Sequence, residues 1–354
     1  MLFETTEQII LAADVGGTNL NLALMAWRQG RGTILHRARF ATQDEVALLD
    51  PVLRFLAQCR EAGLPDRPEL VSLSGAGPVT GKHIPLTNAP WSLDGESLER
   101  ALGIPVQVCN DFTAIAYGVL LLDPRDQHQL LPLPHLDGGL PVPDPQGTVL
   151  VVGAGTGLGV GYVTRAGGMP LAHPSEGGHI GLPILDELTM ELWRHLRAGL
   201  PGPPGAETAV SGPGILTLLS FLLQTGRAPG SVAVDAILAL PPGERPAAIS
   251  AQAGSDPACA QAMALFVDLF ARVCAELCAV FLPTGGLFLA GGIAAKNEAW
   301  FLDGARFMRG FDHTYRQHLN ALAAATPVYL VRDYAISLYG AGFAGLRSQA
   351  GLRG

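Results

Sequence analysis

The chain of 354 residues is long enough for about two domains, which excludes a peptide or a small disulfide-stapled module. Charged residues make up 15% of it and hydrophobic residues 48%, a balance typical of a folded protein rather than a disordered one. The formal net charge is -8 and only two of the 23 basic residues are lysines, so we expect no binding to nucleic acid or to an anionic membrane.

The sequence also indicates where the protein works. Glu4 and Glu7 stand where a signal peptide would need positive charge, and no apolar stretch reaches the roughly 18 residues that span a bilayer. The five cysteines are an odd number without a C-x-x-C pair, which favours reduced thiols over disulfides or a zinc cluster. We therefore expect a cytoplasmic protein without zinc.

The first half of the sequence alternates strand and helix signals. An apolar run, a glycine turn and a second alternating run predict two strands joined by a tight turn over residues 9–25. The elements expected next are a helix over 45–61, strands over 70–74 and 106–109, and a helix over 112–122. Residues 123–146 hold six prolines and indicate a long connection at or just beyond a domain boundary.

The second half begins with the same device. A strand over 149–152 enters a turn with glycine at every second position and continues as a strand through 162–163. The elements expected after it are helices over 214–224 and 258–281, a strand over 287–290, a helix from about 294, a strand over 328–331 and a helix over 336–347. The repeated strand-turn-strand pattern suggests that both halves use it in the same way.

Two common nucleotide signatures are absent. The Gly-Lys pair that ends at Lys82 has Ala76 and His83 where a P-loop needs Gly and Ser or Thr. The alternating glycines of 153–161 never give G-x-G-x-x-G, and the chain continues there as a strand instead of opening a helix. Neither P-loop chemistry nor a Rossmann cofactor site is expected.

The two glycine turns themselves predict phosphate binding. Glycines clear side chains from one face of a hairpin, so backbone N–H groups can approach a phosphate. A tightly packed turn is an equal alternative for either hairpin alone, but two hairpins about 140 residues apart favour a clamp on a nucleotide triphosphate. Thr18 offers a hydroxyl to a phosphate, and Asp14 can hold a hydrated Mg²⁺.

A third glycine site follows the strand over 287–290. Gly291 and Gly292 would let a flat ring or a ribose lie against bare backbone near a helix start. A simple turn is the stronger alternative unless the two hairpins are also present.

Polar residues at strand ends and loops form the remaining candidates. Asn110 and Asp111 follow a strand and can grip neighbouring hydroxyls, although either could simply cap the next helix. Glu176 and His179 flank two glycines, where recognition of a polyol fits better than a metal site and a solvent-facing loop is the alternative. Glu207 alone would indicate compensation of a helix dipole.

Taken in order, these motifs resemble the bacterial glucokinase family, within the superfamily of actin, sugar kinases and Hsp70. The resemblance covers nearly the whole chain, and it does not extend to the related repressor and kinase branch, because no cysteine-rich zinc motif follows His179. The motifs that carry it are Asp14-Val-Gly-Gly-Thr-Asn19, Leu86-Thr-Asn88 with Trp91, Asn110-Asp-Phe-Thr-Ala114, Gly153-Ala-Gly-Thr-Gly-Leu-Gly159, Glu176-Gly-Gly-His179, Ser211-Gly-Pro-Gly214 and Ala290-Gly-Gly-Ile293.

The resemblance implies an α/β, two-domain actin-like ATPase (ribonuclease H-like) fold with an interdomain cleft for ATP and sugar. We expect a small domain from residues 1–121 plus 334–354, a large domain from 122–333, and a homodimer. Asp111 would be the catalytic base. The sugar ligands would be Asn88, Asn110, Asp111, Glu176, His179 and Glu207, and the nucleotide ligands Asp14, Gly16, Gly17, Thr18, Asn19, Gly155, Thr156, Gly157, Gly291 and Gly292.

The predicted function is ATP-dependent phosphorylation of glucose to glucose 6-phosphate, with Mg²⁺ as the metal. A kinase for another hexose, such as glucosamine or mannose, is the alternative among enzymes, and polyphosphate is an alternative donor. A nucleotide-switch protein of the actin or Hsp70 kind would share the phosphate hairpins but would not need Asn110-Asp111 or the Glu176 to His179 motif. A sugar-sensing regulator is a third possibility.

Overall fold

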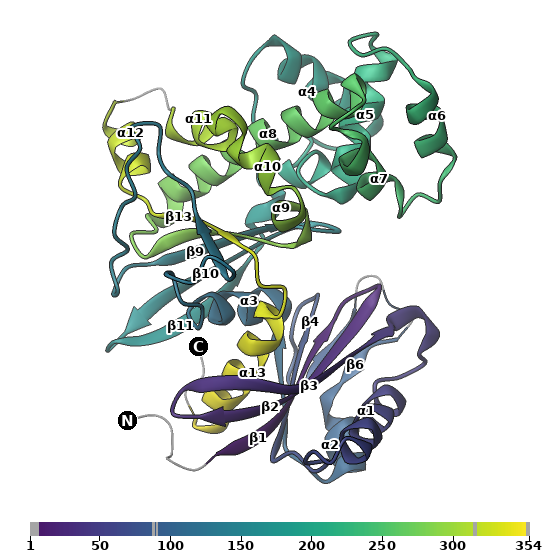
Figure 1. Cartoon of the computed structure of the whole chain (residues 1–354), viewed down its shortest axis with the longest axis vertical. Helices are drawn as coiled ribbons and strands as arrows, with labels where there is room; N and C mark the ends of the chain where they lie inside the picture. The colour runs from purple at the N-terminus through teal and green to yellow at the C-terminus, as the bar shows by residue number, and fades with distance from the viewer. Residues whose placement is uncertain (1–6, 87–88, 90, 314–316, 352–354) are drawn as a thin grey trace. The chain divides into compact units, whose positions relative to one another are not determined.

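The computed structural model describes residues 7–86, 89, 91–313 and 317–351. The fold divides into two units (Figure 1). The first unit gathers the described residues of 1–123, 161–174 and 333–354, and the second those of 124–160 and 175–332. Along the described part of the chain, no helix combines the length and the apolar composition that a membrane span requires.

The first unit is built on a five-stranded sheet. The predicted turn joins its two central antiparallel strands, and the strand expected at 70–74 runs parallel to the first of them. The strand order is β3-β2-β1-β4-β7, with bounds β1 Gln8–Val15, β2 Asn19–Arg28, β3 Arg31–Ala41, β4 Leu70–Gly75 and β7 Val106–Asn110. The two-residue strands β5 (His83–Ile84) and β6 (Leu93–Asp94) pair separately.

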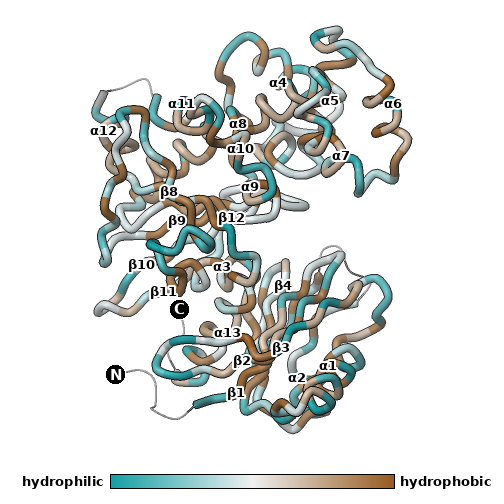
Figure 2. Tube along the Cα trace, viewed as in Figure 1, coloured by the Kyte–Doolittle hydropathy of each residue, from teal (hydrophilic) through white to brown (hydrophobic). Residues whose placement is uncertain are grey.

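Helices cover both faces of this sheet. Alternate residues of the strands, such as Leu11, Leu20 and Leu22, form a core with apolar residues of α1 (Leu49–Glu61) and α2 (Gly95–Leu102), visible as brown segments in Figure 2. The other face carries α13 (Ile336–Gln349), where Ser72 of β4 donates a 2.5 Å hydrogen bond to the carbonyl of Ala341. The sheet is therefore buried on both sides.

The helices α3 (Asp111–Val119) and α13 touch backbone to backbone. A Cβ added at Gly340 would lie 1.7 Å from the carbonyl oxygen of Ala114, and one at Gly118 would lie 2.2 Å from that of Ile336. Only glycine permits this approach, so these two residues fix the distance between α3 and α13.

The second sheet has six strands in a related order. Its first five positions, β11-β10-β9-β12-β13, repeat the order of the first sheet, and β8 adds a sixth strand at the edge. The strand β12 runs parallel to both β9 and β13. The bounds are β8 Leu130–Pro132, β9 Val149–Ala154, β10 Leu158–Ala166, β11 Met169–Ser175, β12 Gly286–Ala290 and β13 Val328–Val331.

Helices of the second unit surround α8, the longest of the described helices. Phe270 of α8 meets Phe301 and Phe307 edge to face, and Cys274 and Cys278 of the same helix are buried. The bounds are α4 Glu187–Gly199, α5 Gly212–Gln224, α6 Val232–Ala239, α7 Arg245–Gln252, α8 Pro257–Phe281, α9 Gly292–Lys296, α10 Glu298–Leu302, α11 Arg306–Asp312 and α12 Gln317–Ala324.

The structure differs from the predicted elements in several places. The helix expected from residue 45 begins at Leu49, because residues 42–44 form a separate short 3₁₀ helix and Val46 is exposed. The strand β3 was not predicted, since polar residues such as Arg37 and Arg39 interrupt its apolar pattern. The expected long connection contains β8, an edge strand that tolerates its proline.

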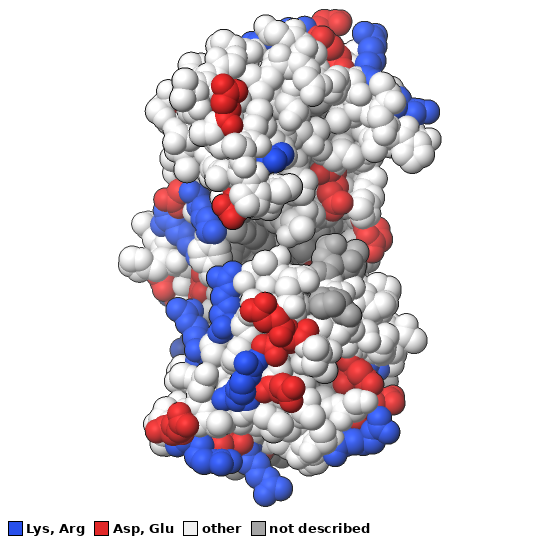
Figure 3. Space-filling model, turned by 90° about the vertical axis from the view of Figure 1, so that its right-hand side faces the viewer, with Lys and Arg blue, Asp and Glu red and all other residues white. Residues whose placement is uncertain are grey.

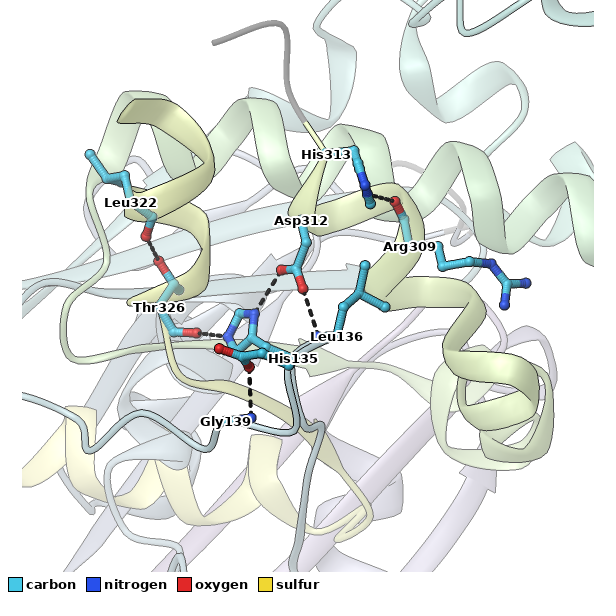
Figure 4. A network of polar contacts seen from close by, with 9 residues as sticks. His135, Leu136, Gly139, Arg309, Asp312, His313, Leu322 and Thr326 are labelled. Carbon is cyan, nitrogen blue, oxygen red and sulfur yellow. Dashed lines mark hydrogen bonds and ion pairs between the residues drawn. The ribbon is translucent and has the colours of Figure 1, made fainter. Parts of the chain in front are cut away.

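A buried histidine ties that connection to the second unit (Figure 4). The Nδ1 atom of His135 lies 2.7 Å from Asp312 Oδ1, and its Nε2 atom lies 2.8 Å from the carbonyl oxygen of Thr326. Leu136 N donates a 3.0 Å hydrogen bond to the other oxygen of Asp312. Both ring nitrogens face acceptors, which favours the doubly protonated imidazole and raises the pKa of His135 although burial opposes the rise.

Candidate functional site

The first glycine turn, residues 16–18, is held in place by hydrogen bonds to its carbonyl oxygens. Thr42 donates its hydroxyl to the Gly16 carbonyl (2.7 Å) and its N–H to the Thr18 carbonyl (3.0 Å), and Gln43 Nε2 donates to the Gly17 carbonyl (2.8 Å). The N–H groups of Gly17 and Thr18 make no hydrogen bond within the described residues. These two donors are available to an anion.

Asp14 ends the strand before this turn and is the charged group of the site. Ser337 of α13 donates its hydroxyl to Asp14 Oδ2 at 2.9 Å. Burial raises the pKa of Asp14, and hydrogen bonding by Ser337, Asn21 and Ser74 lowers it in part. A buried carboxylate of this kind is stabilised in its charged form by a nearby cation.

The residues present suit Mg²⁺ better than a metal held by protein ligands alone. Among the described residues, no three His, Cys, Asp or Glu side chains come together as a metal cage. Mg²⁺ needs only one or two carboxylates, and takes its other ligands from water and phosphate oxygens. Asp14 beside a turn with open N–H donors fits that requirement.

Asn110 is the N-cap of α3. Its Oδ1 accepts hydrogen bonds from the N–H groups of Phe112 (2.9 Å) and Thr113 (3.2 Å), and its Nδ2 donates to the Gly77 carbonyl (3.3 Å). The alternative noted from the sequence therefore applies to Asn110, whose side chain also hydrogen-bonds Asp111 and lowers the pKa of that carboxyl in part.

Asp111 is the first helical residue of α3 and is not the cap. Burial raises its pKa to about 6, the hydrogen bond from Phe112 N (2.9 Å) opposes this, and the negative charge of Asp14 adds to the rise. The structure thus brings Asp14 and Asp111 close enough to influence each other. A carboxylate with a raised pKa beside a strand end is typical of a proton acceptor.

The second glycine turn, residues 155–157, is braced differently. The N–H of Gly212, at the start of α5, donates to the Gly155 carbonyl (2.7 Å), and Leu158 N donates to Glu207 Oε2 (2.8 Å). A Cβ at Gly157 would lie 2.5 Å from the same carboxylate oxygen, whereas one at Gly155 would meet nothing within 4 Å. Glu207 therefore supports the turn directly.

The Glu176 to His179 motif packs on the start of β10. A Cβ at Gly178 would lie 1.7 Å from the Leu158 carbonyl oxygen, so this glycine is required for the contact. The side chains of Glu176 and His179 are 93% and 61% exposed, and His179 Nε2 lies 3.6 Å from Glu176 Oε2. Ala206 N donates to the Ile180 carbonyl (2.7 Å), which places the Glu207 segment beside this motif.

The third glycine site lies at the end of β12, beside the second turn. The register pairs Ala290 with Gly153, and Gly291 adopts a φ of +90° with its Cα against the end of β9. A Cβ at Gly291 would lie 2.6 Å from the Ala154 carbonyl oxygen. Gly291, Gly292 and the second turn are therefore neighbours.

Comparison with known proteins identifies the family. The family model described as Glucokinase matches residues 11–348. The chain is 30% identical to glucokinase from Nostoc sp. (strain PCC 7120) over 96% of this chain and 99% of that protein. The chain belongs to the glucokinase family.

Solved structures agree with this family assignment. Glucokinase from an Antarctic psychrotroph superposes with a TM-score of 0.76 at 28% identity, covering 94% of this chain and 97% of that one. Glucokinase from Balamuthia mandrillaris in complex with glucose has the same fold, with a TM-score of 0.75 at 20% identity over 96% and 94% of the two chains. The expected α/β two-domain sugar-kinase fold is confirmed.

Membership of the glucokinase family does not by itself assign the site residues. The predicted residues fall into a set in the first unit and a set in the second, and Asn88 lies outside the described residues. Sequence reasoning missed Thr42 and Ser337, which carry no motif of their own. The Ser211-Gly-Pro-Gly214 motif did signal the α5 start that braces the second turn.

Proposed function

We propose that the protein transfers the terminal phosphoryl group of ATP to glucose and forms glucose 6-phosphate, with Asp111 as general base. The observation that carries this proposal is the carboxylate of Asp111, whose pKa is raised to about 6. Such a group is charged at neutral pH and still basic enough to accept a hydroxyl proton. Membership of the glucokinase family supports glucose as the substrate.

The nucleotide would bind through backbone donors. The proposed phosphate contacts are the first turn, residues 16–19, and the second, residues 155–157, with Gly291 and Gly292 beside the nucleoside. Within the described residues, the N–H groups of Gly17 and Thr18 in the first turn and of Thr156 and Gly157 in the second make no hydrogen bond. Asp14 would hold Mg²⁺ through water. When bound, Mg²⁺ neutralises charge on the phosphoryl groups of ATP.

The sugar would be held by hydrogen bonds from buried and surface groups. Asn88, Asn110, Asp111, Glu176, His179 and Glu207 are the proposed ligands. The exposed carboxylate of Glu176 and the imidazole of His179 are free to meet hydroxyl groups, which supports this assignment. Asp111 accepts the proton of the attacking hydroxyl, because phosphoryl transfer otherwise needs mainly positioning and charge stabilisation.

A coupled assay across hexoses and donors tests the proposal. With ATP, we expect the highest kcat/KM for glucose and much lower values for mannose, glucosamine and galactose. An epimer moves a hydroxyl and glucosamine replaces one with an amine, so buried polar groups that bond that hydroxyl lose their partner. A higher kcat/KM for another hexose would refute the assignment of glucose as the substrate. Nucleotide binding without turnover of any hexose would favour a nucleotide-switch protein. Turnover with polyphosphate alone would refute ATP as the phosphoryl donor.

Three further statements remain predictions from the sequence. They are a homodimer, a cytoplasmic location, and domains of 1–121 with 334–354 and of 122–333. Light scattering during size-exclusion chromatography tests the first, and limited proteolysis tests the last, because cleavage should concentrate at the boundaries.

A further inference from the structure

A row of polar residues crosses the first sheet on the face that α13 covers. The strand registers pair Arg39 with Asn21, Asn21 with Asp14, Asp14 with Ser74, and Ser74 with Cys109. Paired residues of neighbouring strands lie side by side on one face of a sheet. The row therefore runs from β3 to β7 with Asp14 at its centre and Arg39 at its outer end.

The side chain of Arg39 is directed toward the first glycine turn. Its Nε donates a 2.7 Å hydrogen bond to Asn19 Oδ1, although the register places Asn19 opposite Ala41, two positions further along β3. Asn19 directly follows Thr18 of the turn. A long side chain on an edge strand can make this diagonal contact, and it holds the guanidinium beside the turn.

Arg39 keeps most of its donors. A guanidinium has five N–H groups, and the bond to Asn19 uses one of them. Within the described residues no further hydrogen bond and no carboxylate partner is found for Arg39, which is exposed.

Three other cations of the first unit have carboxylate partners within the described residues. Arg54 bonds to Glu45, Arg60 lies 2.5 Å from Asp66, and Lys82 bonds to Glu99. Charges of both signs alternate on the face drawn in Figure 3, where the described residues form no large basic patch. A cation without a carboxylate partner, fixed next to open N–H donors, is thus a specific feature of the first turn.

We propose that Arg39 binds the phosphate groups of ATP at the first glycine turn. The inference rests on the proposed kinase function and adds a residue to its nucleotide site. The planar guanidinium can bond two phosphate oxygens at once, and its anchor on Asn19 reduces the rotamer freedom that binding would otherwise remove. Asp14 on β1 would hold Mg²⁺ through water, and Arg39 on β3 would add a positive charge on the far side of β2.

The competing interpretation is that Arg39 only braces Asn19. The two interpretations differ in what its loss does to nucleotides with and without phosphate. If Arg39 contacts phosphate, its loss weakens the binding of ATP and ADP and leaves the binding of adenosine unchanged. If Arg39 only braces the turn, its loss affects the binding of all three compounds alike or mainly lowers the stability of the protein.

The test measures dissociation constants for the parent, Arg39→Ala, Arg39→Lys and the control Arg37→Ala. Arg37 lies on the same strand and face, two residues further from the turn, so the control makes the same change of charge. ATP and ADP are titrated calorimetrically, adenosine by competition against ADP, and glucose separately, with melting temperature as the check on folding. We expect Arg39→Ala to weaken ATP binding about ten- to a hundredfold and adenosine binding less than twofold.

The remaining expected results are a partial loss in Arg39→Lys, unchanged glucose binding, and an Arg37→Ala variant within about twofold of the parent. Equal losses for ATP and adenosine, a similar loss in Arg37→Ala, or ATP binding by Arg39→Ala within twofold of the parent would each overturn the proposal. If Arg39→Ala does not fold, Arg39→Lys is used instead, and its loss of affinity for ATP is compared with its loss of affinity for adenosine. A parent that binds ATP but phosphorylates no hexose refutes the proposed function alone, and one that binds no ATP refutes both.

Discussion

The two glycine turns stand at the same position in two sheets of related strand order, between β1 and β2 and between β9 and β10. Both leave backbone N–H groups open. The first is braced by Thr42 and lies beside Asp14 and Arg39, whereas the second is braced by Gly212 N–H and by Glu207. The two turns thus share a backbone design. A buried aspartate and an arginine accompany the first turn, whereas a single carboxylate, that of Glu207, accompanies the second.

The largest effect expected from this comparison is on catalysis by the first unit. Changing Asp111 to Asn should lower kcat by at least about 10²-fold, since a carboxamide cannot accept the proton. The melting temperature should stay at the parental value because Asn110, not Asp111, caps α3. Steady-state kinetics and thermal unfolding measure both.

The matched control for this substitution is Glu207→Gln in the second unit. Its amide oxygen can still accept the Leu158 N–H, so kcat should fall less than in Asp111→Asn. A folded Asp111→Asn variant with near-parental kcat would remove Asp111 from the mechanism and end the distinction between the two turns.

The next effect is a pH dependence of the reaction. The raised pKa of Asp111 predicts that kcat/KM for glucose is constant above about pH 6 and falls as pH drops through that value, because protonation removes the base. Below it, the rate should fall about tenfold per pH unit. The same acid limb in the residual activity of Asp111→Asn would assign it to another group.

A pair of alanine substitutions tests whether Glu207 braces the second turn. Gly157→Ala places a methyl group against the Glu207 carboxylate and should lower the free energy of unfolding by about 1–3 kcal/mol, since it disturbs the bond to Leu158 N. Gly155→Ala enters open space and should change it by less than about 0.5 kcal/mol. Urea denaturation of both variants measures this difference. Equal losses would mean that Glu207 does not brace the turn.

The smallest effect is a pH dependence of stability in the second unit, opposite in sign to that of catalysis. Burial alone would lower the pKa of His135, but hydrogen bonds to Asp312 and Thr326 and the charges of Asp312 and Asp137 raise it overall. Its contribution to stability is therefore complete below the ordinary pKa of about 6.5 and is lost as pH rises through the raised value.

Urea titrations of the parent and of His135→Gln between pH 6 and 9 can detect it. A single group contributes a slope of at most about 1.4 kcal/mol per pH unit, and that slope should be missing from the variant. Parallel curves for the two proteins would show that the imidazole is not charged in the folded state.

Much of the fold was predictable because its elements have strong periodic patterns. Helix α8 and strand β12 agree with the expected ranges within a residue, since long apolar runs with clear caps leave few alternatives. Strand β3 was missed because its exposed residues, Arg37 and Arg39 among them, hide the alternation of an edge strand. An edge strand with an exposed polar face depends on a pairing partner that the local sequence does not identify.

The site was predictable only as far as its motifs reach. Glycine turns and the Asn110-Asp111 pair have recognisable spacing, but the sequence could not decide which of the two residues caps α3, because both side chains suit an N-cap. Ser337 and Arg39 contact Asp14 and Asn19 across long separations in the chain, and no local pattern marks such partners.

The bond between Ser337 and Asp14 also concerns synthesis, because the two residues are 323 positions apart. Asp14 leaves the ribosome early, and the residues of α13 are synthesised only at the end of translation of this sequence. At about 5–20 residues per second, that interval lasts on the order of tens of seconds. Until then the face of the sheet that α13 covers is bare and the carboxylate lacks its serine donor. A nascent chain therefore exposes this apolar face over that period, and the face is covered only once α13 has been released from the ribosome.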